Sequence, residues 1–330
     1  MSPFQLLPRQ KLTVTMSKMS PVPDGLVGVR FDVAVSRMLG MSRAKVDSLI
    51  ATNEVSILGR ATDKATKLGP RDVIAIDIQE KQPVQEPEST QLGVLYEDDD
   101  IIVVDKPVGV AAHASIGWTG PTVLGSLLKR GVHITSYGPA NRQGIVSRLD
   151  VGTSGAMLVC KSELAYVEMR RQFSAHEVVK IYHALAQGRL LENKATIDAP
   201  IGRDRVADFR FTVTPAGKPA ITHYDVLERH SVATLAEVNL ETGRTHQIRV
   251  HFASIGHPLV GDPLYGADPQ LGESLGLDRQ WLHAMRLDFK HPRTRQWVSV
   301  SSHYPADLQR ALDTLRNSDI QPAGESPLSH

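Results

Sequence analysis

The feature that most constrains the fold of this chain is a series of strand-like apolar runs. These runs cluster together and do not alternate regularly with helices. They begin near residue 92, and the clearest helix-like segments between them are 163–174 and 247–254. The runs cover residues 94–96, 101–104, 156–160, 180–186, 221–227 and 233–240. Strands alternating with helices predict a parallel sheet, whereas clustered strands favour an antiparallel one. We therefore predict an α+β domain with a mixed, mostly antiparallel central sheet and flanking helices over residues 92–317.

A smaller α/β unit is predicted ahead of this domain, over residues 28–78. Apolar residues recur at helical spacing after Val29, and Ser42 is well suited to cap a second helix over residues 43–51. Short strand-like runs follow, and the longest of them, over residues 72–78, alternates in the manner of a half-buried strand.

The remaining segments lack apolar periodicity and are not expected to fold by themselves. Residues 1–27 contain four prolines and are predicted to be a flexible extension. Residues 79–91 are polar, contain two prolines and are predicted to be a linker between the two units. Residues 318–330 are rich in Pro, Ser and Gly and are predicted to be a disordered tail.

Composition excludes several classes of protein. No apolar run approaches the roughly 20 residues of a membrane helix, and the N-terminus lacks the apolar core of a signal peptide, so we expect a cytoplasmic protein. The single cysteine, Cys160, cannot form an intrachain disulfide. Without a sustained heptad pattern we expect a monomer. The net charge of +1 neither supports nor excludes an RNA partner, because phosphate contacts depend on local charge.

The segment RLDVGTSG, residues 148–155, lies directly before an apolar strand. An acidic residue beside glycines and hydroxyls can be held in an unusual turn with its carboxylate pointing away from the framework, which predicts a functional Asp150. The alternative is an Asx turn that only caps the strand.

Two further segments gather polar side chains. In ETGRTHQIRVH, residues 241–251, a strand is expected to end at a glycine turn and a short helix to begin near Thr245; a solvated helix start is the alternative. His246 and His251 are five residues apart and do not share a helix face, so no metal site is expected. Tyr182 lies on a predicted strand, where ordinary packing is the alternative to a functional role.

The chain resembles the RluA/RluD-type pseudouridine synthases in three segments that occur in the family's order, RLDVGTSGAMLVCKS, KIYHALAQGRL and ETGRTHQIRVHFASIGHPLVGDPLYG. The segment EDDDIIVVDKPVGVAAH is similar to the family's strand pair and Lys-Pro-x-Gly turn. The segment RFDVAVSRMLGMSRAKVDSLIATNEVSI resembles an S4 RNA-binding domain. The resemblance implies the pseudouridine synthase fold and an enzyme that isomerises uridine to pseudouridine in structured RNA.

The expected RNA partner is large-subunit rRNA of the 23S type or a pre-ribosomal particle. A tRNA substrate is an alternative, as is a non-catalytic RNA-binding factor of ribosome assembly.

The resemblance also implies roles for individual residues. Asp150 corresponds to the catalytic aspartate, Tyr182 to the tyrosine that packs on the flipped uracil, and Arg249 to the basic residue that pairs with the aspartate. Such a cation would keep the carboxylate ionised, and a bidentate pair is the geometry expected. The expected substrate-binding residues are Arg148, which would help to displace the target base, with Thr153, His246 and Gln247.

In the S4-like unit, Arg37, Arg43 and Lys45 are expected to contact RNA phosphates; a solvated helix face is the alternative. This unit departs from the family pattern at Asn53, where a glycine is usual, but asparagine tolerates the left-handed backbone conformation. The catalytic domain departs at Ser147, where His or Asn is usual. No cofactor is expected, because the isomerisation is redox-neutral and the sequence contains no nucleotide-binding motif.

Overall fold

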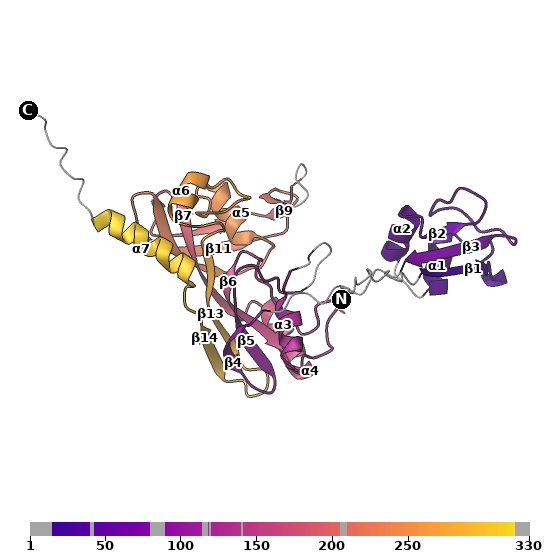
Figure 1. Ribbon diagram of the computed structural model, residues 1–330, viewed down its shortest axis with the longest axis horizontal. Coiled ribbons are helices and arrows are strands. Elements are labelled where there is room, and N and C mark those ends of the chain that lie inside the picture. Colours follow the sequence, from indigo (N-terminus) through magenta and orange to yellow (C-terminus); the bar gives the residue numbers. More distant parts are fainter. Residues whose placement is uncertain are drawn as a thin grey trace, which may run out of the picture. The chain divides into compact units, whose positions relative to one another are not determined.

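The chain divides into two compact units, Met1–Glu86 and Pro87–His330 (Figure 1). The division lies within the segment that was predicted to be a linker. The computed structural model describes residues 15–39, 43–79, 90–113, 118, 120–139, 141–204 and 210–320. Most of the predicted linker, half of the predicted N-terminal extension and the tail beyond residue 320 lie outside these residues. Among the helices so described, none has the length and apolar character needed to span a membrane.

The first unit packs two helices on a three-stranded antiparallel sheet. The helices are α1 (Phe31–Leu39) and α2 (Arg43–Ala51), and a short 3-10 turn, η1 (Asp24–Leu26), precedes them. The sheet has the order β1 (Thr15–Pro21), β3 (Val73–Gln79), β2 (Val55–Ile57). Phe31 and Ile74 are fully buried in the shared core. Asn53 has a φ of 57°, so it adopts the left-handed conformation expected of it.

The prediction of an irregular N-terminal segment is wrong for Thr15–Pro21. These residues form β1, which pairs with β3 along its whole length, from Thr15 opposite Gln79 to Pro21 opposite Val73. The segment has no apolar alternation of its own, and Met19 is largely exposed. Its strand conformation therefore comes from backbone hydrogen bonds to β3, a non-local cause that the local pattern does not contain.

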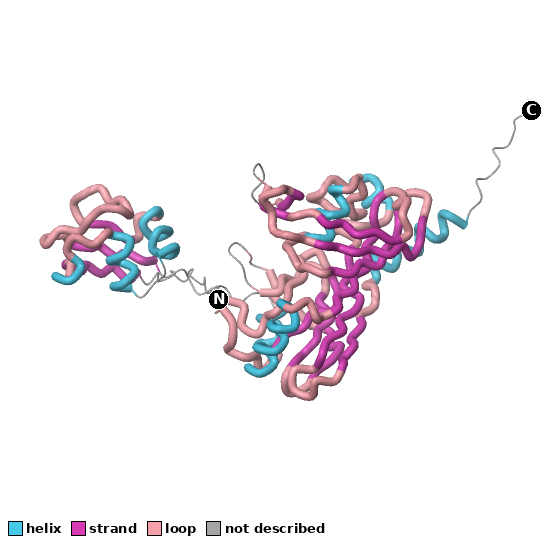
Figure 2. The backbone as a smooth tube through the Cα atoms, turned by 180° about the vertical axis from the view of Figure 1, so that it is seen from behind, coloured by secondary structure: helices cyan, strands magenta, loops and turns pink. Residues whose placement is uncertain are grey.

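The second unit is built on one large twisted sheet, seen from the two sides in Figures 1 and 2. The sheet has the order β4-β5-β6-β13-β7-β12-β11-β8, and β14 pairs with β13. Its strands are β4 (Gly93–Glu97), β5 (Ile101–Lys106), β6 (Ser154–Cys160), β7 (Val179–Gln187), β8 (Lys194–Asp198), β11 (Ile221–Arg229), β12 (Ala233–Leu240), β13 (Leu282–Lys290) and β14 (Trp297–Ser301).

The strand pairs are antiparallel except at one place, where β13 runs parallel to β6. The predicted mixed, mostly antiparallel α+β fold is confirmed. A separate hairpin consists of β9 (Ile201–Arg203) and β10 (Phe211–Val213).

Helices cover both faces of the sheet. On one face, α3 (Val123–Lys129) packs against β5 and β6, and α5 (Gln247–Ser254) packs against β7 and β12. On the other face, α4 (Glu163–Ser174) and α7 (Ala306–Ile320) bury their apolar sides. The short α6 (Pro269–Ser274) lies in the connection between α5 and β13. Tyr182 packs against the hydrophobic clusters under both α3 and α5, so it lies between these two helices on the face of the sheet that they share.

Candidate active site

A cavity of about 540 Å³ brings together the segments that the sequence singled out. This volume is in the usual range for ligand sites in proteins. Its walls come from the loop before β6, the end of α4, the start of β7, and the turn between β12 and α5. The lining residues that were predicted as site residues are Arg148, Asp150, Thr153, Tyr182, His246, Gln247 and Arg249.

Asp150 lies in a tight turn just before β6. The amide of Thr153 donates to the carbonyl of Asp150 at 3.0 Å, which closes the turn through the backbone. The carboxylate of Asp150 is 27% exposed, and its basic neighbours, Arg249 and His246, both lie at the start of α5. The turn therefore leaves the carboxylate facing the cavity, as the functional interpretation of this segment requires.

Arg249 reaches Asp150 from α5, but its bidentate partner is another carboxylate. Nη1 of Arg249 donates to Oδ2 of Asp150 at 3.4 Å, whereas Nε and Nη2 donate to the two oxygens of Asp262 at 2.7 and 2.8 Å. The expected bidentate pair with Asp150 is thus wrong. Asp262 has a fully buried side chain, and a buried carboxylate requires a paired cation more strongly than a partly exposed one does.

The surroundings of Arg249 keep it charged. Burial opposes the charge, but the hydrogen bonds to Asp262 and the negative charges of Asp262 and Asp150 hold the pKa of Arg249 above its ordinary value. The ring of Tyr265 lies 4.9 Å from the guanidinium carbon and adds a cation–π contact. Asp150 therefore faces a fixed positive charge that another residue holds in place.

His246 approaches Asp150 from a strained position. It precedes α5 with a φ of 56°, and its Nε2 lies 3.8 Å from Oδ2 of Asp150. Its Nδ1 lies 2.7 Å from the hydroxyl of Tyr265, which also accepts from the amide of Phe211 at 3.2 Å. Burial lowers the pKa of His246, against the opposing effect of Asp150. The left-handed backbone conformation is uncommon for a residue other than glycine, and such strained residues cluster at functional sites.

Tyr182 and Lys180 project from the same face of β7 into the cavity wall. Burial, together with the negative charge of Asp150, raises the pKa of Tyr182, so its hydroxyl stays protonated. Burial lowers the pKa of Lys180 to about 8. Lys180 was not among the predicted site residues, although it lies two residues before Tyr182 on an alternating strand, which places the two side chains on one face.

The four predicted substrate-binding residues divide into two groups. Arg148 is exposed and donates to Oγ1 of Thr245 at 3.2 Å, and His246 faces Asp150. Thr153 is buried, and its Oγ1 accepts from Gln280 at 3.2 Å. Gln247, also buried, uses its whole amide within the protein.

Gln247 lines the cavity, but the hydrogen bonds of its side-chain amide all go to protein groups. Its oxygen accepts from Thr242 Oγ1 and from the amide of Arg244, while its nitrogen donates to the carbonyl of Ile221 and to Thr222 Oγ1. A primary amide has two donor and two acceptor positions, and all four are occupied. Gln247 thus fixes the turn that presents its neighbours to the cavity.

Asp262 and Tyr265, which hold Arg249 and His246, were not identified as site residues. Both occur in the quoted segment GDPLYG, but nothing in the local pattern indicates that this loop returns to α5. A buried aspartate next to a predicted site arginine becomes recognisable only once the loop is placed in three dimensions.

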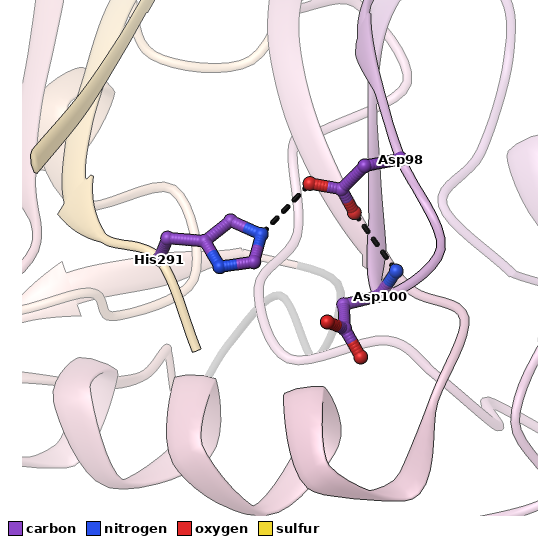
Figure 3. A group of neighbouring side chains, drawn as sticks. All are labelled: Asp98, Asp100 and His291. Atoms are coloured by element: carbon purple, nitrogen blue, oxygen red, sulfur yellow. Dashed lines mark hydrogen bonds and ion pairs between the residues drawn. The ribbon is translucent and has the colours of Figure 1, made fainter. Parts of the chain in front are cut away.

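A second group of titratable residues lies away from the cavity, where Asp98, Asp100 and His291 meet (Figure 3). Nε2 of His291 lies 2.7 Å from Asp98, whose other oxygen accepts from the amide of Asp100. Asp100 is held by Arg293 at 2.6 and 2.7 Å and by Ser162 at 2.6 Å. These partners already satisfy both carboxylates, so the group acts as a tie between the β4–β5 turn and the β13–β14 turn.

The chain is similar to a known protein family in sequence and in fold. Residues 100–254 match the family model of RNA pseudouridylate synthase. An uncharacterised RNA pseudouridine synthase of Mycobacterium bovis is 51% identical over 90% of this chain and 97% of its own length. Ribosomal large subunit pseudouridine synthase D of Nitrosomonas europaea is 40% identical over 90% of this chain and 87% of its own length. The structure of human RNA pseudouridylate synthase domain containing 1 superposes with a TM-score of 0.55 at 27% identity, covering 74% of this chain and all of the human one.

Proposed function

The chain belongs to the RNA pseudouridylate synthase family and is an enzyme that isomerises uridine in RNA, and from this premise we propose that Asp150 is its catalytic nucleophile and large-subunit rRNA its substrate. One observation carries the first part of the proposal. The carboxylate of Asp150 faces a cavity with the guanidinium of Arg249 3.4 Å away, and Tyr182 lines the same cavity.

The reaction explains why a carboxylate in this setting is useful. The N1–C1′ bond of uridine breaks, the uracil turns, and a C5–C1′ bond forms, after which the C5 proton leaves and N1 carries a proton. Three routes are chemically open to Asp150: attack on C1′, attack on C6 of the base, or removal of a ribose proton. Each route requires the ionised carboxylate, and no route requires an oxidant, a reductant or a cofactor.

The site places a fixed positive charge beside that carboxylate. Nη1 of Arg249 lies 3.4 Å from Oδ2 of Asp150, and the bidentate pair with Asp262 prevents the guanidinium from turning fully towards Asp150. Asp150 therefore has a cation within reach without being locked in a bidentate pair, and it remains free to react.

Base flipping assigns roles to two other residues. A stacked uridine must leave its helix, at a cost of about a few kcal/mol that is offset by stacking in the pocket and by a side chain that fills the gap. Tyr182, whose hydroxyl stays protonated, offers the stacking surface. Arg148 at the exposed rim offers the filling side chain.

Two observations support rRNA as the substrate. Relatives of 36–40% identity are named for the large ribosomal subunit. The second is the segment of the first unit that resembles an S4 domain, in which Arg37 is exposed on α1 and Arg43 and Lys45 belong to α2. Such a unit would position a large structured RNA through its backbone, without reading bases.

The test is pseudouridine mapping of total RNA from cells that carry either the wild-type protein or Asp150→Asn. We expect a uridine of large-subunit rRNA to lose its modification in the variant. Asp99→Asn, at an exposed position away from the cavity, is the matched control and should leave the map unchanged. Loss confined to tRNA would overturn the proposed substrate, and an unchanged map with Asp150→Asn protein present would overturn the role of Asp150.

A further inference from the structure

The turn that carries Asp150 is hydrogen-bonded to side chains that do not line the cavity. The carbonyl of Val151 accepts from Lys106 Nζ at 3.5 Å and from the amide of Gly109 at 3.0 Å. The carbonyl of Gly152 accepts from Nη1 of Arg279 at 3.1 Å. Two consecutive carbonyl oxygens after Asp150 are therefore each bound by the side chain of a buried basic residue, Lys106 or Arg279.

Arg279 and Gln280 form the base on which this turn rests. Nε2 of Gln280 donates to Oγ1 of Thr153 at 3.2 Å. A Cβ atom at Gly152 would come within 2.6 Å of Oε1 of Gln280, so the glycine lies directly against that amide. Because the contact leaves no room for a side chain, a shift of residues 279–280 must be passed on to the turn.

Arg279 also reaches the start of the last helix. Its Nε and Nη2 donate to the two oxygens of Asp307 at 2.7 and 3.0 Å, and Asp307 is the second residue of α7. Nη1 donates, besides Gly152, to Oγ of Ser154 at 3.2 Å. The side chain is only 4% exposed. One planar guanidinium thus joins α7 to both ends of the segment that follows Asp150.

The chemistry of this arginine gives its partners fixed positions. Its donors lie in one plane, so the bidentate pair with Asp307 sets the direction in which Nη1 points. A buried cation also requires a nearby anion, and Asp307 provides it. If the charge of Asp307 is removed, the guanidinium loses the contact that orients it towards Gly152.

We propose that Arg279, oriented by Asp307, is a positioning residue for Asp150, so that the start of α7 fixes the turn that carries the nucleophile. The inference rests on the proposed role of Asp150. It assigns no direct contact with RNA to either residue of the pair. Small displacements of a reacting group reduce rates strongly, so the chemical step should be affected more than RNA binding.

The experiment uses the full chain and bulk RNA from cells that lack the gene, labelled with tritium at C5 of uridine. Release of the C5 proton reports pseudouridine formation, and single-turnover rates at saturating enzyme isolate the steps after binding. We expect Asp307→Asn to slow this rate by about tenfold and to leave the Kd for the RNA within twofold. Asp313→Asn, at an exposed position on the same helix, should change neither value.

A further variant separates positioning from simple destabilisation. Leu315→Ala removes a buried side chain of α7 without touching Asp307, and it should lower the unfolding temperature while leaving the single-turnover rate near that of the wild type. A single-turnover rate for Asp307→Asn within twofold of the wild type would overturn the proposal. So would a rate for Leu315→Ala that is reduced as much as that of Asp307→Asn, at a temperature where both variants are folded. Full activity of Asp150→Asn would instead refute the proposed nucleophile, whatever Asp307→Asn shows.

Discussion

Asp262→Asn tests the electrostatic arrangement of the site most directly. The substitution preserves shape but removes the charge that pairs with Arg249, and the new amide nitrogen would face a guanidinium N–H. Removing one partner of a buried ion pair costs roughly 3–5 kcal/mol. Asp150 lies 3.4 Å from the same guanidinium and is partly exposed, so it compensates in part. We therefore expect a loss of about 3 kcal/mol in the free energy of unfolding, at the lower end of that range.

Tryptophan fluorescence during urea unfolding measures this loss of free energy for the second unit, which contains Asp262. All three tryptophans, Trp118, Trp281 and Trp297, belong to the second unit. The transition midpoint should fall while its slope stays constant, because the surface exposed on unfolding is unchanged.

Two companion variants sharpen the Asp262→Asn experiment. Asp288→Asn breaks the partly exposed pair with Arg286 and should cost less than about 1 kcal/mol. Combining Asp262→Asn with Arg249→Met removes both charges and should cost less than Asp262→Asn alone, because no unpaired buried charge remains. Two results would refute the view that the buried cation requires Asp262. One is a loss below about 1 kcal/mol in the free energy of unfolding of Asp262→Asn. The other is a double variant that is less stable than Asp262→Asn alone.

Three further predictions concern the stacking residue, a buried lysine and the first unit. Tyr182→Phe should retain most of the single-turnover activity because the ring still stacks; an inactive variant would show that the hydroxyl transfers a proton. Burial lowers the pKa of Lys106 from its ordinary 10.5 to about 7, so the folded protein binds fewer protons than the unfolded chain between these values. The stability of the wild type relative to Lys106→Met should therefore rise by about 2 kcal/mol between pH 7 and pH 9, as measured by urea unfolding, and a flat difference would contradict this. Removal of residues 1–86 should weaken binding to long RNA in a filter assay and leave the tryptophan-detected unfolding of the second unit unchanged; equal binding would contradict an RNA-binding role for the first unit.

Local periodicity was sufficient to predict elements whose pattern repeats within the segment itself. The helices expected at 163–174 and 247–254 coincide with α4 and α5, because the apolar face of each repeats within one or two turns, and α4 also has a local N-cap in Ser162. The strand runs at 101–104 and 156–160 lie within β5 and β6, which are buried on both faces. The same reasoning placed Asp150 in a turn before a strand.

Features that depend on distant segments were not predictable in this way. β13 occupies a central place in the sheet, yet its sequence was not singled out, and its parallel pairing with β6 depends on a chain return of more than 100 residues. Arg249 was expected to pair with Asp150, but its bidentate partner is Asp262 on a loop that local pattern does not place. The resemblance implied that Gln247 binds substrate, and the local pattern did not show that its amide is hydrogen-bonded to Thr242 and Ile221.

The short parallel pairing of β13 with β6 sets the order in which this enzyme can become active during synthesis. The pairing joins His283 to Ser154 and Ala284 to Gly155, directly after the turn that carries Asp150. Contacts between such distant residues form late, because the loop between them must be closed first. A nascent chain that has emerged from the ribosome to residue 254 already contains every candidate catalytic residue, but not the strand that supports their turn. The protein should therefore stay inactive on the RNA around it until its last quarter has been translated and has folded.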